Sequence, residues 1–176
     1  MNFAPSLEAG NKAGLESQPT QGGTMLVHVI KPRPGAEIDA VGENYKVNAW
    51  QRIVGEPPMN KQIVLDDIPV LLQREPDNQV DPNAVKVIVN REHVGYLPRE
   101  VAEHVSPRLI PVEKADALAV ATGNLWYVQR PEGLKVNVKV NIPNDWVFDG
   151  TLDTATYEDE KPAYKRSKLW KALGLK

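Results

Sequence analysis

The sequence predicts a mainly β fold of the α+β class: a small antiparallel barrel of about six strands with two helices at its ends. Runs typical of β-strands recur along the chain, at residues 37–41, 63–65, 68–74, 84–89, 93–97, 117–128 and 134–142. Two other stretches, residues 44–54 and 98–109, place apolar residues at helical spacing. Turn-forming residues separate neighbouring strand runs closely enough for hairpins.

Composition and charge limit the class of protein. The chain has 176 residues, of which 41% are hydrophobic and 25% charged, as expected of one globular domain with tails. Its formal net charge is −2, whereas a protein that coats nucleic acid usually has a basic excess, so any nucleic-acid contact should be local. The absence of cysteine excludes disulfides and thiolate zinc sites and fits a cytoplasmic location. Neither a membrane span nor a signal peptide is expected.

The N-terminal part should contain a tail, one strand and the first helix. Residues 1–24 are rich in polar and turn-forming residues and predict a disordered tail, with the domain proper at residues 25–148. Residues 26–30 could be a strand or a docking linker, and residues 37–41 a strand that ends at Gly42. Asn44 is expected to cap a helix that contains Tyr45, Trp50 and Ile53, and Gly55 is expected to end it.

The central part should form two strand segments, a hairpin and the second helix. Pro69 lies within residues 68–74 and indicates an edge or a bulge there. Residues 84–89 and 93–97 should pair through a turn at residues 90–92. Pro98 suits the first position of a helix, and Pro107 should limit that helix.

The C-terminal part should add a second long hairpin. Residues 117–128 are interrupted by Gly123 and Asn124, a signal for a bulge or turn, and residues 134–142 alternate cleanly after Gly133. Residues 149–164 resemble an acidic linker. Residues 165–176 carry five basic residues and no acidic one, and could form a docked amphipathic helix or a free arm.

A polar loop between two strands is the most distinctive motif. Residues 76–83 combine Pro76 and Pro82, which fix φ, with Asx residues whose side chains bond to nearby backbone N–H groups. The loop should therefore be stiff, either simply as structure or to present polar atoms at the barrel rim. A calcium loop is excluded, because Pro82 and Ile88 stand where an EF-hand needs Gly and Glu.

Residues 74–78, 81–87 and 95–98, with residues 41–45, together resemble the signature of the HIRAN domain family. The resemblance runs from about residue 38 to residue 109, and the hairpin to residue 142 would complete the domain. It implies an OB-like barrel and a non-catalytic module that binds single-stranded DNA or a DNA 3′ end. A protein partner such as a helicase or nuclease is also implied.

The resemblance also implies roles for individual residues. Tyr45 would stack on a base, Asp81 would accept a hydrogen bond from the free 3′-hydroxyl, and Arg99 would hold a phosphate. Each has a plainer alternative: Tyr45 could be buried in the core, Asp81 could only close an Asx turn, and Arg99 could be an ordinary exposed arginine.

Three further residues are candidates for the nucleic-acid site, namely Arg74 and Lys86 on strands beside the loop and Tyr96 on the returning strand. Two positions depart from the family pattern. Val80 replaces a second stacking aromatic, and Asn44 replaces a basic residue. Base stacking contributes about 1–3 kcal/mol per base, so these departures should weaken binding or favour a protein-interaction adaptor.

An enzyme is not expected. The three histidines, His28, His93 and His104, are scattered, and the sequence lacks the spaced ligands of a metal site. No nucleophile motif or phosphate-binding glycine-rich lysine loop is present. Neither a cofactor nor a metal is therefore expected.

Overall fold

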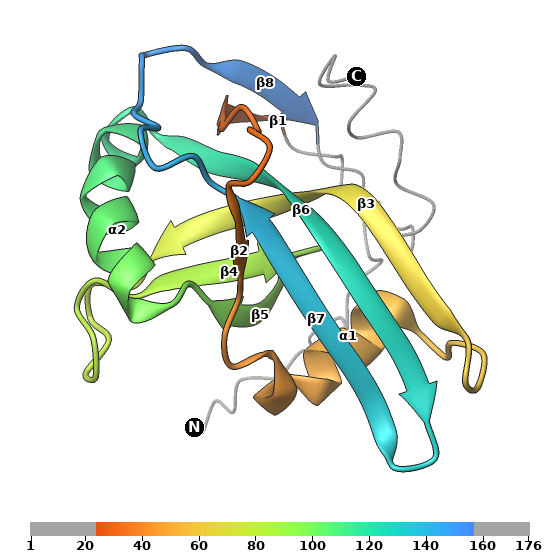
Figure 1. Ribbon diagram of the computed structural model, residues 1–176. Coiled ribbons are helices and arrows are strands. Elements are labelled where there is room, and N and C mark those ends of the chain that lie inside the picture. Colours follow the sequence, from red (N-terminus) through yellow and green to blue (C-terminus); the bar gives the residue numbers. More distant parts are fainter. Residues whose placement is uncertain (1–23, 157–176) are drawn as a thin grey trace, which may run out of the picture.

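The computed structural model describes residues 24–156, and Figure 1 shows their arrangement. Eight strands, two α-helices and one 3-10 helix follow in the order β1 (Thr24–Val29), β2 (Glu37–Asp39), η1 (Glu43–Tyr45), α1 (Val47–Val54), β3 (Gln62–Arg74), β4 (Val85–Val89), β5 (Glu92–Tyr96), α2 (Arg99–Lys114), β6 (Ala117–Arg130), β7 (Gly133–Asn141) and β8 (Asp153–Thr156). The predicted basic segment at residues 165–176, and nearly all of the predicted N-terminal tail, lie outside the described residues.

All eight strands belong to one curled sheet built around β6. The sheet follows the order β2-β7-β6-β3-β4-β5, and β6 also pairs with β1, which in turn pairs with β8. The pairs are antiparallel except that of β1 with β6. Two backbone hydrogen bonds between Val41 and Tyr96 join the two ends of the path. This arrangement confirms the predicted mainly β, OB-like α+β fold.

Two strands, β1 and β8, were not among the strand runs predicted from the sequence. Residues 26–29, from the stretch 26–30 that fitted either a strand or a docking linker, belong to β1. Residues 153–156, within the stretch predicted as an acidic linker, form β8 and pair with β1 from Thr24 to Val27. Edge pairing of this kind leaves only a weak sequence signal, because a strand of four residues shows little alternation.

The two segments predicted at residues 63–65 and 68–74 form one strand, β3, with a bulge between Leu65 and Ile68. Asp67 in the bulge has a φ of 53°. Pro69 pairs with β6 on one side, while the ladder with β4 begins only at Leu71, so its missing N–H disrupts no bond there. The bulge therefore belongs to β3, and β6 runs without a break through Gly123.

Gly123 instead allows a close approach between strands. A Cβ atom at this position would lie 2.6 Å from Val70 Cγ2 and 2.8 Å from the Lys139 carbonyl oxygen. Both distances are too short for an alanine without displacement of β3 or β7.

The first helix differs from the sequence prediction. Asn44 lies within η1, and α1 begins after Lys46 with no side-chain cap, so the predicted Asn44 cap is wrong. Gly42 turns the chain with a φ of 81°, and the indole N–H of Trp50 donates to the Glu43 carbonyl at 3.1 Å. This bond ties the buried indole to the 3-10 turn that precedes the helix. Gly55 ends α1 as predicted, with a φ of 67°.

The second helix is longer than predicted. Pro98 takes the position before the first helical residue, not the first helical position itself, and Pro107 does not limit the helix, which continues through Pro111 to Lys114. Each internal proline removes one main-chain hydrogen bond. Burial of Leu109 and Val112 beyond Pro107 favours continuation, because the helix packs these side chains on the sheet.

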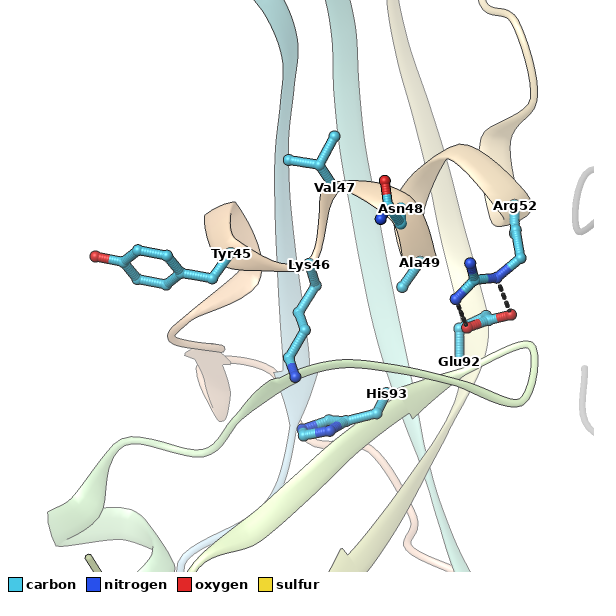
Figure 2. Close-up of a pocket in the computed structure, with 8 residues that line it drawn as sticks. All are labelled: Tyr45, Lys46, Val47, Asn48, Ala49, Arg52, Glu92 and His93. Atoms are coloured by element: carbon cyan, nitrogen blue, oxygen red, sulfur yellow. Dashed lines mark hydrogen bonds and ion pairs between the residues drawn. The ribbon is translucent and has the colours of Figure 1, made fainter.

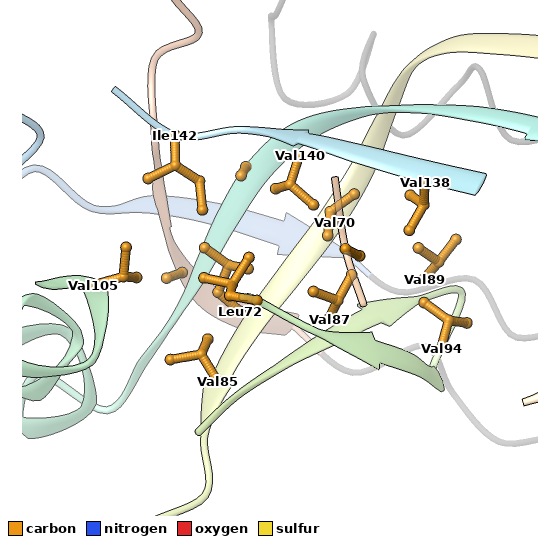
Figure 3. Packing of buried hydrophobic residues seen from close by; sticks show 14 of the residues in the cluster. Val70, Leu72, Val85, Val87, Val89, Val94, Val105, Val138, Val140 and Ile142 are labelled. Atoms are coloured by element: carbon orange, nitrogen blue, oxygen red, sulfur yellow. The ribbon is translucent and has the colours of Figure 1, made fainter. Parts of the chain in front are cut away.

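The core fills the inside of the curled sheet and is closed at its ends by α1 and α2. Valine is its commonest residue, and Figure 3 shows valines that β3, β4, β5 and β7 contribute to it. Trp50 and Ile53 of α1 and Leu109 of α2 are fully buried against it. Because β4 is paired on both edges, it is held firmly where the polar loop enters it.

Candidate nucleic-acid interface

Tyr45 lies on the surface beside the point where the sheet closes. Its side chain is 91% exposed, whereas Trp50, five residues later, is fully buried. The alternative of a buried Tyr45 is therefore wrong. The 3-10 turn at Glu43–Tyr45 changes the helical phase, so that Trp50 and not Tyr45 faces the interior. An exposed phenol ring at this position is available to stack on a planar ligand.

The loop between β3 and β4 is held by its own polar groups. The Asn78 side-chain oxygen accepts from the N–H groups of Val80 and Asp81, both at 3.0 Å. Asp81 Oδ1 accepts from the Asn83 N–H at 2.9 Å, which makes the expected Asx turn. No described residue bonds to the second oxygen of Asp81. The three backbone-to-side-chain bonds make the loop rigid. The second carboxylate oxygen of Asp81 remains available to accept a hydrogen bond from a ligand.

Glu75 is the residue on which the side chains of the loop, β4 and β5 converge. The sequence did not single it out as a site residue. Its carboxylate accepts from Asn78 at 2.7 Å and from the Tyr96 hydroxyl at 2.9 Å, and it pairs with Lys86 Nζ at 2.7 Å. These donors, Lys86 foremost, lower the pKa of Glu75 to about 2. The sequence hint was only the opposite charges of Glu75, which directly follows β3, and Lys86, which lies on the paired strand β4.

Lys86 and Tyr96 are therefore brought together, but they face Glu75. The Tyr96 ring also meets the His93 ring edge-on, with centroids 4.6 Å apart. Donation to Glu75 and burial raise the pKa of Tyr96, burial being the larger cause. Both side chains hold the loop in place from β4 and β5.

Arg74 points elsewhere. Its guanidinium donates to the Ser106 hydroxyl and to Glu113, both at 3.0 Å, and only 18% of the side chain is exposed. These contacts fasten the end of β3 to α2. Within residues 24–156, the Arg74 side chain contacts α2 and bonds neither to Asp81 nor to Tyr45.

Arg99 is the first residue of α2 and lies close to the end of the loop. The Leu97 N–H donates to the Val85 carbonyl at 3.0 Å, which holds the start of α2 next to β4. The Arg99 side chain is 71% exposed, and Glu103, at 3.7 Å, is its one ion-pair partner within residues 24–156. An exposed cation with one weak partner is free to contact an anion in solution.

Val80 is 86% exposed within the polar loop. The two N–H bonds to Asn78 hold its backbone but leave the side chain in solvent. The position that the resemblance assigns to a second aromatic platform is thus at the surface, and here carries an aliphatic side chain.

A shallow hollow of about 330 Å³ lies beside Tyr45, between α1 and the hairpin of β4 and β5 (Figure 2). Lys46 points across it toward His93, and Arg52 closes its far wall by a bidentate pair with Glu92 at 2.6 and 2.7 Å. Sequence reasoning did not find this hollow, since its walls come from residues 45–52 and 92–93, and only the fold brings these together.

Within residues 24–156, no group of three or more histidine, aspartate or glutamate side chains could hold a metal ion. No helix in the same part of the chain is long and apolar enough to cross a membrane.

Fold and rim together define a small OB-like domain that presents one exposed aromatic, a rigid acidic loop and an exposed arginine. The family model of the HIRAN domain matches residues 44–144, more than half of the sequence, and the chain belongs to this family. The family match begins at the position before Tyr45 and spans every candidate residue.

Two solved structures are similar at low identity. A protein from Lactobacillus plantarum is 18% identical, with a TM-score of 0.33, over 67% of this chain and 97% of that one. The HIRAN domain of human HLTF is also 18% identical, with a TM-score of 0.33, over 88% of this chain and 95% of that one. No match was found among curated proteins.

Proposed function

We propose that this protein is a non-catalytic DNA-binding module that takes a single-stranded 3′ end at the rim of its sheet. Membership of the HIRAN family supports a DNA-binding module in general. The observation that carries the finer proposal is the 91% exposure of Tyr45, a large aromatic side chain without a packing role. It follows closely after Val41, which bonds to the backbone of Tyr96, and the Tyr96 hydroxyl in turn holds Glu75 at the start of the loop. A base stacked on this ring would be bound with little regard to its identity, because every base has a π-face.

Asp81 is the proposed acceptor for the terminal 3′-hydroxyl. One carboxylate oxygen is held by the Asn83 N–H, which fixes the orientation of the other. An ionised carboxylate accepts a hydroxyl hydrogen bond but repels a phosphate at the same position. This residue would therefore select a free 3′ end.

The remaining candidates divide into contact and positioning roles. Arg99 would hold a backbone phosphate, since its guanidinium is exposed and donates freely. Lys86 and Tyr96 would act through Glu75, by keeping the loop in its bound shape. Arg74 would act through α2, whose first turn carries Arg99.

The test compares oligonucleotides that end in a free 3′-hydroxyl or in a 3′-phosphate, by fluorescence titration at low salt. The wild type should bind the hydroxyl form more tightly, and Asp81→Asn, which keeps Oδ1 for the Asx turn, should lose this preference. Asp77→Asn, an exposed acid in the same loop, is the matched control. Equal affinity of the wild type for both ends would reject the 3′-hydroxyl mechanism.

A protein-interaction adaptor is the second candidate function, and the exposure of Val80 favours it. An aliphatic side chain has no aromatic face on which a base could stack, so its exposure on a rigid surface loop has no evident use in base stacking. In this case, a partner such as a helicase or nuclease should be captured from extract after nuclease treatment. Loss of all captured proteins on nuclease treatment would count against the adaptor.

A further inference from the structure

The hollow beside Tyr45 contains a cation that the fold leaves unpaired. Arg52 and Glu92 neutralise each other through two short hydrogen bonds, but no described residue forms an ion pair with Lys46. The amine of Lys46 points into the hollow toward His93 (Figure 2). The wall formed by Arg52 and Glu92 is thus electrically balanced, and the Lys46 charge dominates the opening.

We propose that this hollow is a phosphate subsite, in which Lys46 and His93 bind the phosphodiester next to the nucleotide that stacks on Tyr45. The inference rests on the proposed function and extends it from the terminal nucleotide to the preceding linkage. Tyr45 and Lys46 are consecutive residues, so a base on the ring brings its own backbone to the mouth of the hollow. A volume of about 330 Å³ accommodates a phosphate with its waters.

His93 would respond to the bound phosphate. Its Nε2 lies 3.0 Å from the Gly95 carbonyl oxygen, and burial, followed by the charge of Lys46, lowers the pKa of the free imidazole. The charged groups that face it from the packed elements are Lys46 before α1, Lys86 on β4 and Glu75 at the loop. A phosphate in the hollow would offset the two lysines and favour the imidazolium, which can donate from both ring nitrogens.

Affinity should therefore depend on pH in a defined direction. Since the complex favours protonated His93, binding should tighten as pH falls through the pKa of His93 in the complex. It should level off below the lower pKa of the free protein. His93→Gln should remove this dependence, while His104→Gln on α2 should leave it unchanged.

The decisive experiment uses the full chain and thymidine oligonucleotides with one methylphosphonate, which removes the charge of a single linkage. Lys46→Gln should weaken binding of the native oligonucleotide about tenfold and lower the salt slope by roughly 0.7. Lys46→Gln should not change the affinity for an oligonucleotide whose methylphosphonate lies next to the stacked nucleotide, because that linkage has no charge for the lysine to bind. Lys61→Gln, an exposed lysine outside the hollow, is the matched control.

The outcomes separate the two proposals. If Tyr45→Ala weakens binding but Lys46→Gln behaves as Lys61→Gln does, the phosphate subsite is wrong and the DNA-binding proposal stands. If the wild type binds no oligonucleotide, both are overturned. If Lys46→Gln weakens the native and the methylphosphonate oligonucleotides equally, the lysine acts on the fold and the subsite is again rejected.

Discussion

The candidate interface has two sides that use their polar side chains in opposite ways. One is the loop between β3 and β4 with its neighbours on β4 and β5, and the other is the segment of η1 and α1. On the loop side, Asn78, Lys86 and Tyr96 all bond to Glu75, and the second carboxylate oxygen of Asp81 is the main acceptor left unused among the described residues. On the side of η1 and α1, Tyr45 is almost fully exposed and Lys46 pairs with no described residue. The loop part of the family motif thus serves mainly to make the loop rigid. Tyr45, which belongs to the same motif, and Lys46, which the sequence did not single out, are left available for a ligand.

This contrast has an energetic consequence. A change on the loop side removes mutual hydrogen bonds and should lower the free energy of unfolding. A change on the side of η1 and α1 removes exposed groups and should leave stability unchanged while affecting binding. The following predictions test this division, beginning with the largest effect.

Gly95→Ala should be the most damaging single change, because Gly95 lies where the two sides meet. An added Cβ would lie 2.7 Å from the Val41 carbonyl oxygen, which bonds to the neighbouring Tyr96 N–H. We expect a loss of about 3 kcal/mol in the free energy of unfolding, measured by urea denaturation. An unchanged urea midpoint would show that the closure between Val41 and Tyr96 is not needed for stability.

Glu75→Gln should destabilise the fold by about 2 kcal/mol, since it removes the charged acceptor shared by Lys86, Asn78 and Tyr96. Glu132→Gln, in the exposed turn between β6 and β7, is the control and should change stability little. If both variants have the same urea midpoint, the hydrogen bonds to Glu75 do not stabilise the fold, and the proposed division of the interface is wrong.

The same carboxylate predicts a pH dependence. The pKa of Glu75 falls from its ordinary 4.5 to about 2 on folding, so its contribution is fully present above pH 4.5. It should be lost as pH falls from there toward 2. Denaturation of wild type and Glu75→Gln at several pH values should show the two stabilities converging over this window. A constant difference would mean that another group causes the acid sensitivity.

Tyr45→Ala should weaken oligonucleotide binding about tenfold through the loss of one stacking surface. Its free energy of unfolding should change by less than about 0.5 kcal/mol, because the side chain is 91% exposed. Met59→Ala, another exposed apolar side chain, should alter neither property. A marked loss of stability in Tyr45→Ala would contradict the proposed division of the rim.

Arg99→Gln should have the smallest effect, a few-fold loss of affinity with a salt slope lower by roughly 0.7, since it removes one exposed phosphate contact. Arg130→Gln, at the exposed end of β6, is the control. Titrations at two or more salt concentrations distinguish this electrostatic loss from a change in the fold. A loss of affinity that does not vary with salt would exclude a phosphate role.

The sequence alone was sufficient for the elements whose residues interact locally. Alternation along β4, β5 and β7 predicted two hairpins, and Gly55 predicted the end of α1, because periodicity and turn chemistry are properties of neighbouring residues. The Asx turn of Asp81 followed for the same reason. The loop motif also predicted the family, which the match at residues 44–144 confirms.

Tertiary structure decided what depends on distant segments. Whether Tyr45 or Trp50 turns inward depends on the 3-10 turn that fits η1 against β5. The roles of Glu75 and Arg74 depend on which of β4, β5 and α2 lies beside the end of β3. Pairing of β8 with β1 and continuation of α2 past Pro107 both follow from packing energy that outweighs local preference. The hollow beside Lys46 exists only once α1 and the hairpin are assembled, because its walls come from segments about 40 residues apart in the chain.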